Sequence, residues 1–370
     1  MAKATVKTGS AKTKASPTRR GASPAAVGRP PASAKSASLR AGRVPPKRGA
    51  GRFAWLAAAW VAAFAGALIL VSALVPATQT WSAVFALAAT FAPHALALWL
   101  FAMLAAVFAA RRKAKLLALV MAFGLVCNVL AIAPYTSALF RTATPWPGTA
   151  LKVMTLNLRF GYADPDAVSA LVSAEGAQAL VLTEVSEPLA ARLAEKLAQT
   201  LPYQAGQPSR GNTAEGTMVF ARHPLSVVDA AETTYHSVAV EVADPAGRYV
   251  VVGVHPISPL HATASWMSDG AAIAALATRQ MSSPLIIAGD FNATLEHLPL
   301  RRIMATGLAD AVRQSESGWV PTYPSDVAFL PPLIGIDHIL ANRSFHANNA
   351  HSVPISGSDH LGLVAELVRK

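Results

Sequence analysis

Five short segments of this chain carry side chains whose types and spacing could do chemistry, and each lies beside an apolar, strand-like run. In chain order they are Leu156-Asn157-Leu158, Thr183-Glu184-Val185, Gly289-Asp290-Phe291-Asn292, Gly335-Ile336-Asp337-His338 and Ser358-Asp359-His360. Carboxylates, amides and an imidazole are the groups that bind a divalent cation and move a proton. Together they indicate a metal-dependent site for phosphodiester hydrolysis.

Phosphodiester hydrolysis sets requirements that these residue types meet. Negative charge must be neutralised on the phosphoryl and leaving oxygens, and a water must lose a proton while held in line. Mg²⁺, or Mn²⁺ in its place, suits the first task and prefers a few carboxylates plus waters as ligands. Because Glu184 follows the apolar run 180–182, its carboxylate needs a partner, and we expect Glu184 and Asn157 to bind the metal. Taken alone, Glu184 also fits an exposed strand end, and Asn157 a turn.

Asp290 and Asn292 flank Phe291 at the end of the apolar run 285–289. An Asx turn that closes the strand would explain an Asp at this position. The combination Gly-Asp-Phe-Asn favours a functional role for both polar residues.

The histidines differ in their surroundings. A His that deprotonates water needs a carboxylate to orient it, and Asp337 is the candidate partner of His360. Asp359 is adjacent to His360, so its side chain should point elsewhere, where a metal role suits it. His255 ends another strand-like run and could donate to a phosphate oxygen, or be structural. His338, next to Asp337, should face the opposite side of its strand and be structural.

The positive charge of the chain is concentrated in its first part. The chain has 32 Lys and Arg against 20 Asp and Glu, a formal net charge of +12. Residues 1–150 hold 18 of the basic residues and no acid, whereas residues 151–370 have a net charge of −6. The positive net charge therefore does not indicate a nucleic-acid-binding fold. The single cysteine, Cys127, excludes a disulfide within the chain.

Residues 1–52 are rich in Ala, Ser, Pro, Gly and basic residues and contain no aromatic residue before Phe53. Such a segment cannot bury a core, so we expect a disordered tail. A solvated cytoplasmic tail attracted to anionic lipid head groups is favoured over a nucleic-acid-binding arm.

Residues 53–140 contain three long apolar stretches: Phe53–Val75, Trp81–Ala110 and Leu116–Phe140. A helix that crosses a bilayer needs roughly 20 apolar residues, so each stretch predicts a transmembrane helix. His94 lies beside Pro93 within the second stretch, which favours a kink or interfacial turn over an intramembrane functional site.

Lys and Arg placement predicts the topology. Thirteen basic residues precede the first span, and Arg111, Arg112, Lys113 and Lys115 lie between the second and third. Both clusters mark the cytoplasmic side. We therefore expect an integral protein of the bacterial inner membrane with a cytoplasmic N-terminus and everything after the third span in the periplasm.

Beyond a Pro- and Gly-containing linker at 141–150, the pattern changes to alternating strands and helices. Predicted strands fall at 152–158, 179–182, 217–221, 237–242, 249–254, 285–288, 336–340 and 361–367. Predicted helices fall at 165–175, 188–200 and 266–279. Residues 151–370 thus form an α/β domain.

The motif order in 151–370 resembles the endonuclease/exonuclease/phosphatase superfamily, which includes DNase I, and in particular its bacterial membrane-anchored, YafD-like branch. The resemblance implies a two-sheet α/β sandwich. It also implies that Asn157, Glu184 and Asp359 serve the metal and that Asp290 and Asn292 hold the attacking or leaving group. His255 would then contact phosphate, and His360 with Asp337 would be the general base.

The sequence thus predicts a membrane-anchored, Mg²⁺-dependent phosphoesterase, nuclease-like in its chemistry, with nucleic acid as one candidate substrate. One alternative is hydrolysis of phospholipid or phosphoinositide head groups, because the anchor holds the site near the bilayer. A second is an inactive binding or scaffold protein on the same fold, and the complete set of polar residues argues against it.

Overall fold

The computed structural model describes residues 48–109, 115–136 and 144–370. Most of the predicted tail, the basic residues 111–113 and the start of the linker lie outside these ranges. The first helix, α1 (Arg48–Leu74), begins before the predicted boundary at residue 53. Arg52, in the first turns of this helix, donates a hydrogen bond from Nη2 to Ala109 O at 2.9 Å. This contact ties the start of α1 to the end of a neighbouring helix.

The second predicted span is broken rather than continuous. Its parts are α2 (Ala83–Thr90), the short turn η2 (Ala92–His94) and α3 (Ala95–Ala109). The break falls at Pro93, which lacks an N–H and fits only the first turn of a new helix. The His94 ring packs 5.6 Å from the Trp319 ring, which is consistent with a turn.

Two helical segments are long and apolar enough to cross a membrane, Gly51–Leu74 and Ala92–Ala109. The third apolar run is Leu117–Ala133, within α4 (Lys115–Thr136), and it is shorter than such a span. The prediction of three transmembrane helices is therefore not confirmed. Between α1 and α2 lies the turn η1 (Pro76–Thr80).

Trp99 of α3 fixes the packing of these helices. An added Cβ at Gly66 of α1 would lie 2.9 Å from the Trp99 ring, and one at Gly124 of α4 would overlap the ring. Both positions therefore need glycine for the indole to fit between the helices. Small residues that allow close approach are typical of helix contacts in membranes.

The remaining residues form two six-stranded sheets. The first has the order β11 (Phe345–Pro354), β12 (Leu361–Arg369), β1 (Ala150–Asn157), β2 (Ala179–Thr183), β4 (Thr217–Ala221) and β3 (Tyr203–Gln207). The second has the order β5 (Leu225–Asp229), β6 (Val238–Val242), β7 (Tyr249–Val254), β8 (Leu285–Asp290), β10 (Asp337–Ala341) and β9 (Ala309–Asp310).

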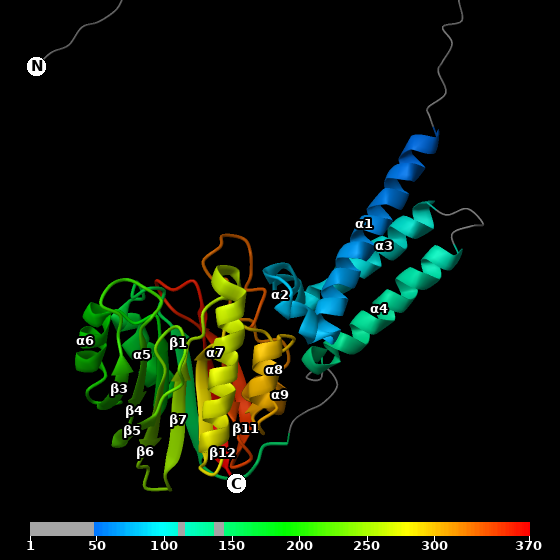
Figure 1. The fold of residues 1–370 in the computed structure, drawn as a ribbon. Helices are drawn as coiled ribbons and strands as arrows, with labels where there is room; N and C mark the ends of the chain where they lie inside the picture. The colour runs from blue at the N-terminus through cyan, green and yellow to red at the C-terminus, as the bar shows by residue number, and fades with distance from the viewer. Residues whose placement is uncertain (1–47, 110–114, 137–143) are drawn as a thin grey trace, which may run out of the picture. The chain divides into compact units, whose positions relative to one another are not determined.

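The sheets pack face to face and helices cover their outer faces (Figure 1). One buried cluster, with Val181, Val251 and Ile286 among its members, fills the space between the sheets. The helices α5 (Pro165–Glu175) and α6 (Glu187–Lys196) cover the first sheet, and α7 (Pro259–Gln280) and α8 (Leu298–Met304) cover the second. A short α9 (Ala311–Gln314) follows β9. The predicted two-sheet α/β sandwich is confirmed.

Local sequence explains where the outer helices begin. Asp164 caps α5 by accepting from Asp166 N at 3.0 Å, and Pro165 occupies the first turn. Ser258 caps α7 in the same way through Leu260 N, so α7 begins at Pro259 rather than at the predicted residue 266. A kink at Ala262 separates its first turn from the regular helix.

Candidate functional site

Sheet topology brings the predicted polar residues to one edge of the sandwich. β1 and β2 run parallel, as do β7 and β8, so Asn157, Glu184, His255 and Asp290 all lie at strand ends. β10 is antiparallel to β8, and its first residue, Asp337, pairs with Asp290. β12 is antiparallel to β1, and His360 directly precedes it.

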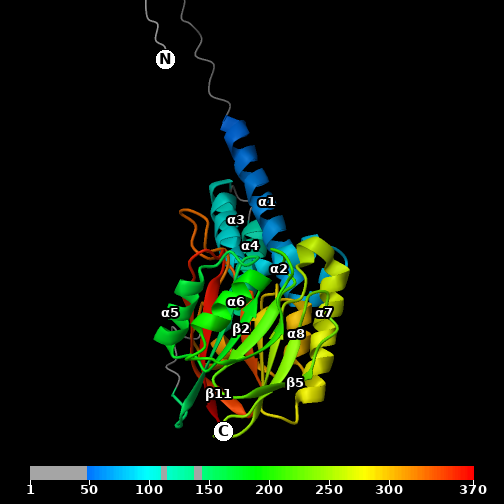
Figure 2. The same cartoon turned by 90° about the vertical axis from the view of Figure 1, so that its left-hand side faces the viewer.

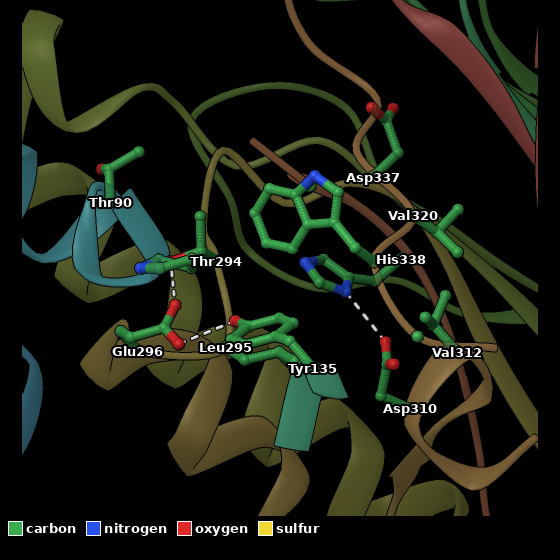
Figure 3. Close-up of a pocket in the computed structure, with 14 residues that line it drawn as sticks. Thr90, Tyr135, Thr294, Leu295, Glu296, Asp310, Val312, Val320, Asp337 and His338 are labelled. Atoms are coloured by element: carbon green, nitrogen blue, oxygen red, sulfur yellow. Dashed lines mark hydrogen bonds and ion pairs between the residues drawn. The ribbon is translucent and has the colours of Figure 1, made fainter. Parts of the chain in front are cut away.

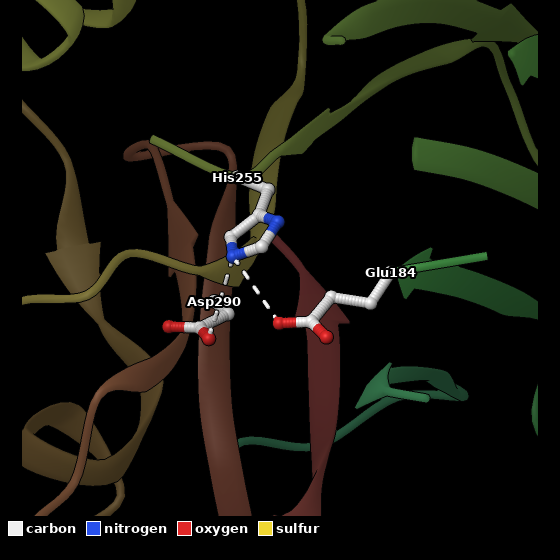
Figure 4. A group of neighbouring side chains, drawn as sticks. All are labelled: Glu184, His255 and Asp290. Atoms are coloured by element: carbon white, nitrogen blue, oxygen red, sulfur yellow. Dashed lines mark ion pairs between the residues drawn. The ribbon is translucent and has the colours of Figure 1, made fainter. Parts of the chain in front are cut away.

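Glu184, His255 and Asp290 form the first cluster at this edge (Figure 4). His255 Nε2 lies 3.9 Å from Glu184 Oε1 and 3.7 Å from Asp290 Oδ2. His255 Nδ1 donates to Ala214 O at 2.9 Å, so Nε2 is the nitrogen directed at the two carboxylates. One atom from each residue lies within 4.8 Å of the others, a spacing that could hold a metal ion.

Asn157 joins the two carboxylates. Its Nδ2 donates to Glu184 Oε1 and to Asp290 Oδ2, each at 3.0 Å, while its Oδ1 accepts from Arg159 N. Asn157 thus positions Glu184 and Asp290 across the gap between the sheets. Its predicted role as a metal ligand remains a prediction.

Glu184 and Asn292 adopt left-handed backbone conformations, with φ of 56° and 46°. Such conformations are uncommon for residues other than glycine and cluster at functional sites. Phe160 N donates to Glu184 Oε2 at 2.8 Å, and Asn292 N donates to Asp290 Oδ1 at 2.8 Å, which holds both strand ends in place.

His360 and Asp337 form a second cluster together with Asp290. His360 Nδ1 lies 2.9 Å from Asp337 Oδ2, and all three side chains are buried. With Nδ1–H donating to Asp337, Nε2 remains for proton transfer and lies 3.7 Å from Asp290 Oδ2. Ser358 Oγ accepts from His360 N and donates to Asn157 O. These two bonds hold the segment before β12 in place beside the end of β1.

The electrostatics of the site favour a bound cation. Burial alone would lower the pKa of His360, but the charges of Asp337, Asp290 and Asp359 and the hydrogen bond to Asp337 raise this pKa to about 10. Burial and the charge of Asp337 raise the pKa of Asp290. A divalent cation beside these carboxylates would lower both pKa values and leave His360 neutral, as a general base must be. The donor set therefore fits a metal ion.

Asp359 lies outside both clusters. Its carboxylate is 4.0 Å from Arg159 Nε, and Arg159 also binds Asp326 at 2.8 Å. Burial is the main cause that raises the pKa of Asp359. Its predicted metal role remains a prediction.

The clusters open into a cavity of about 550 Å³ that sequence reasoning did not foresee. Tyr323, Tyr235 and Phe160 contribute aromatic rings to its wall. The Tyr323 ring lies 4.8 Å from the His360 ring and the Tyr235 ring 5.1 Å from the His255 ring. These aromatic residues lie outside the named helices and strands, where no periodic pattern could have marked them.

His338 faces away from this cavity, as expected for the neighbour of Asp337 in a strand. Its Nδ1 lies 2.8 Å from Asp310 Oδ2 (Figure 3). Its Nε2 lies 2.8 Å from Ala293 O. Burial lowers the pKa of His338, but the hydrogen bond to Asp310, the charge of Asp310, the hydrogen bond to Ala293 O and the charge of Asp337 together raise this pKa.

A family model and several solved structures match this chain. The model of the Endonuclease/Exonuclease/phosphatase family matches residues 154–360. An endonuclease/exonuclease/phosphatase structure from Beutenbergia cavernae DSM 12333 is 24% identical, with 60% of this chain and 72% of that chain covered and a TM-score of 0.49.

Family proteins from two other bacteria share the fold with a TM-score of 0.50 each. The Bacteroides thetaiotaomicron protein is 15% identical, with 61% of this chain and 100% of that chain covered, and the Leptotrichia buccalis C-1013-b protein is 18% identical, with 59% and 99% covered. No curated protein matches this chain. The chain belongs to the endonuclease/exonuclease/phosphatase family, whose members are phosphoester hydrolases.

Proposed function

We propose that the chain is a metal-dependent phosphoesterase of the membrane-anchored, YafD-like branch, in which His360 is the general base. The observation that carries the proposal is the pairing of His360 with Asp337 at 2.9 Å, beside the cluster of Glu184, His255 and Asp290. This arrangement provides a proton acceptor next to a group of cation ligands.

In the proposed reaction, His360 Nε2 takes a proton from water and the water oxygen attacks phosphorus. The bond from phosphorus to the leaving oxygen breaks, and that oxygen takes up a proton from solvent water. Asp337 holds the imidazole in position and stabilises its charged form. His255 Nε2 is placed to donate to a phosphoryl oxygen, and Asp290 and Asn292 hold the attacking or leaving group.

Glu184 and Asp290, together with Asn157, would hold Mg²⁺ or Mn²⁺. The bound ion would neutralise charge on the phosphoryl and leaving oxygens. Asp337 Oδ1 is buried with no hydrogen-bond partner, and this unpaired acceptor adds to the negative charge that a cation would balance.

Membrane anchoring is supported by the apolar surface of the helices. In an 18-residue stretch of each candidate span only 39% of the residues are buried, and the mean hydropathy is high, at 2.2 and 1.9. A core helix of a soluble protein would be mostly buried. We propose that residues 53–140 anchor residues 151–370 in the periplasm with α4 as a third span. A topology reporter fused after Lys370 should be active only outside the cytoplasm, and activity only inside would exclude this arrangement.

The function is tested by hydrolysis of bis(p-nitrophenyl) phosphate and p-nitrophenyl phosphate by the full chain in detergent micelles, with and without Mg²⁺. Turnover that needs the cation and is lost in His360→Ala supports the proposal. A folded full chain that hydrolyses neither probe favours the inactive scaffold.

A further inference from the structure

The active-site cavity is built partly from the membrane-associated helices. Its polar lining includes Glu184, His255, Asp290 and His360. Its lining also includes residues that we call the apolar rim: Leu87 and Phe91 from α2 and its end, Leu260 from the start of α7, and Leu333 and Ile334 from the segment before β10. Figures 1 and 2 both show α2 beside the upper end of α7.

The position of α2 along the chain places it at the surface of the bilayer. The candidate spans end at Leu74 and restart at Ala92, so residues 75–91 join them on one side of the membrane. Given the proposed anchoring, the apolar rim lies where lipid head groups meet acyl chains.

Buried hydrogen bonds hold η1 and α2 against residues 296–298, at the start of α8. Gln79 Nε2 donates to Glu296 O at 3.0 Å, and Gln79 Oε1 accepts from Leu298 N at 2.9 Å. His297 Nε2 donates to Ala86 O at 2.8 Å, while its Nδ1 accepts from Thr294 N. Burial lowers the pKa of His297 to about 4, which keeps this donor neutral. The α2 helix is therefore a fixed wall of the cavity.

The α4 helix also contacts residues 294–296, beside the start of α8. Tyr135 Oη donates to Glu296 Oε1 at 2.7 Å, and Thr294 Oγ1 donates to Glu296 Oε2 at the same distance (Figure 3). The Tyr135 ring packs 5.2 Å from the Trp319 ring.

Several apolar side chains that line the cavity or lie near its lining in sequence are exposed. Leu260 is 66% exposed and Leu87 43%, although both line the cavity. The segment that ends at Leu333 exposes Phe329 fully and Val327 by 46%. Large apolar side chains that remain exposed around an opening mark a surface for an apolar ligand or a membrane.

The charge of the cavity disfavours a nucleic acid. Among the described residues that line it, none is Lys or Arg, whereas three are carboxylates: Glu184, Asp290 and Asp359. Nucleic-acid binding draws most of its affinity from Lys and Arg contacts with phosphates. A single phosphoester on an apolar body matches this combination of polar side chains and an apolar rim.

We propose that the substrate is a membrane lipid with a phosphoester in its head group, which enters the cavity from the bilayer surface. The phosphoester reaches His360 and the metal ligands, and the acyl chains stay against Leu87, Phe91 and Leu260. This inference rests on the proposed phosphoesterase function and on the anchoring.

The test compares lipids with their deacylated counterparts. The full chain in detergent micelles is mixed with dioleoyl phosphatidic acid, phosphatidylglycerol or phosphatidylethanolamine, or with the matching glycerophospho compound, at equal phosphoester concentration. At least one lipid should be hydrolysed more than roughly tenfold faster than its deacylated form, because burial of acyl chains adds binding free energy. Equal rates within every pair, or faster hydrolysis of single-stranded DNA, would overturn the proposal.

Leu260→Asp places a charge on the exposed rim without disturbing a core. The ratio of lipid hydrolysis to bis(p-nitrophenyl) phosphate hydrolysis should fall roughly tenfold in this variant. Val228→Asp, at a 46% exposed position on the edge strand β5, is the matched control and should keep the ratio of the unmodified chain. An unchanged ratio in Leu260→Asp would overturn the role of the rim.

The two proposals fail separately. Hydrolysis of the soluble diester that depends on His360, without hydrolysis of any lipid, contradicts the lipid substrate alone. No hydrolysis of any probe by the folded full chain contradicts the phosphoesterase function, and the lipid substrate with it.

Discussion

Asp337 and His338 are adjacent in β10, yet they belong to two histidine–carboxylate pairs with different surroundings. Asp337 pairs with His360 at 2.9 Å on the face that borders the cavity, among residues that could hold a metal. His338 pairs with Asp310 at 2.8 Å on the other face, and its second nitrogen is bound to Ala293 O. Both pairs are buried.

The difference lies in what the second imidazole nitrogen meets. In the closed pair, His338–Asp310, a backbone carbonyl occupies that nitrogen, so no proton can pass to a substrate. In the open pair, Asp337–His360, the second nitrogen faces Asp290 and the cavity. A short distance between His and Asp therefore does not mark a catalytic pair by itself.

Removal of the metal should give the largest contrast between the pairs. Excess chelator should abolish turnover by the open pair, because the carboxylates would then keep His360 protonated. The stability contribution of the closed pair should not change. Turnover of bis(p-nitrophenyl) phosphate with and without EDTA measures the first effect, and Glu184→Gln should raise the Mg²⁺ concentration needed for half-maximal rate. Full activity in chelator would contradict the metal site.

Loss of the proposed base should separate the pairs by activity. General base catalysis contributes about 10²–10⁴-fold, so His360→Ala should lower kcat by that factor, while His338→Ala should leave kcat nearly unchanged. Asp337→Asn should cost a comparable or smaller factor, and the double variant should fall little further, because the two residues act as a unit. A folded His360→Ala variant with normal kcat would show that another group is the base.

Stability should separate the pairs in the opposite sense. His338→Ala leaves Asp310 buried without its charged partner, which typically costs about 3–5 kcal/mol of unfolding free energy. Urea unfolding of the full chain in detergent micelles measures this loss. A loss below about 1 kcal/mol would show that Asp310 finds another partner.

The smallest expected effect is a pH dependence of the closed pair. The pKa of His338 is raised in the folded chain, so its charged pair stabilises the fold fully below the unfolded pKa of about 6.5. This contribution is lost as pH rises through the folded pKa. The unfolding free energy of the unmodified chain should therefore fall on alkalinisation by more than that of His338→Asn, and parallel curves would contradict the assignment.

Sequence pattern predicted the elements whose apolar residues are contiguous or periodic. The helix at 165–175 and the strands at 217–221 and 249–254 are present with these bounds. The pattern missed β11, Phe345–Pro354, because its residues are mostly polar or small and only some are buried. It also missed the edge strands β3 and β5, whose side chains are largely exposed.

The candidate site was predictable for the same physical reason that it exists. Parallel strands end at one edge of a sheet, so polar residues such as Asn157 and Glu184 that follow apolar runs converge there. The contribution of α2 was not predictable, because contacts such as His297 with Ala86 join residues far apart in sequence and leave no local pattern.

The buried contacts of η1 and α2 with the start of α8 have a practical consequence for anyone who shortens the chain. A fragment that begins at residue 144 would lose Ala86, which is part of the same apolar cluster as Trp266 and Leu300. It would also leave Leu298 N and Glu296 O without Gln79. Such a fragment would expose apolar surface and backbone groups without hydrogen-bond partners, and it should self-associate. Crystallisation and assay of this protein are therefore better served by keeping residues 48–143.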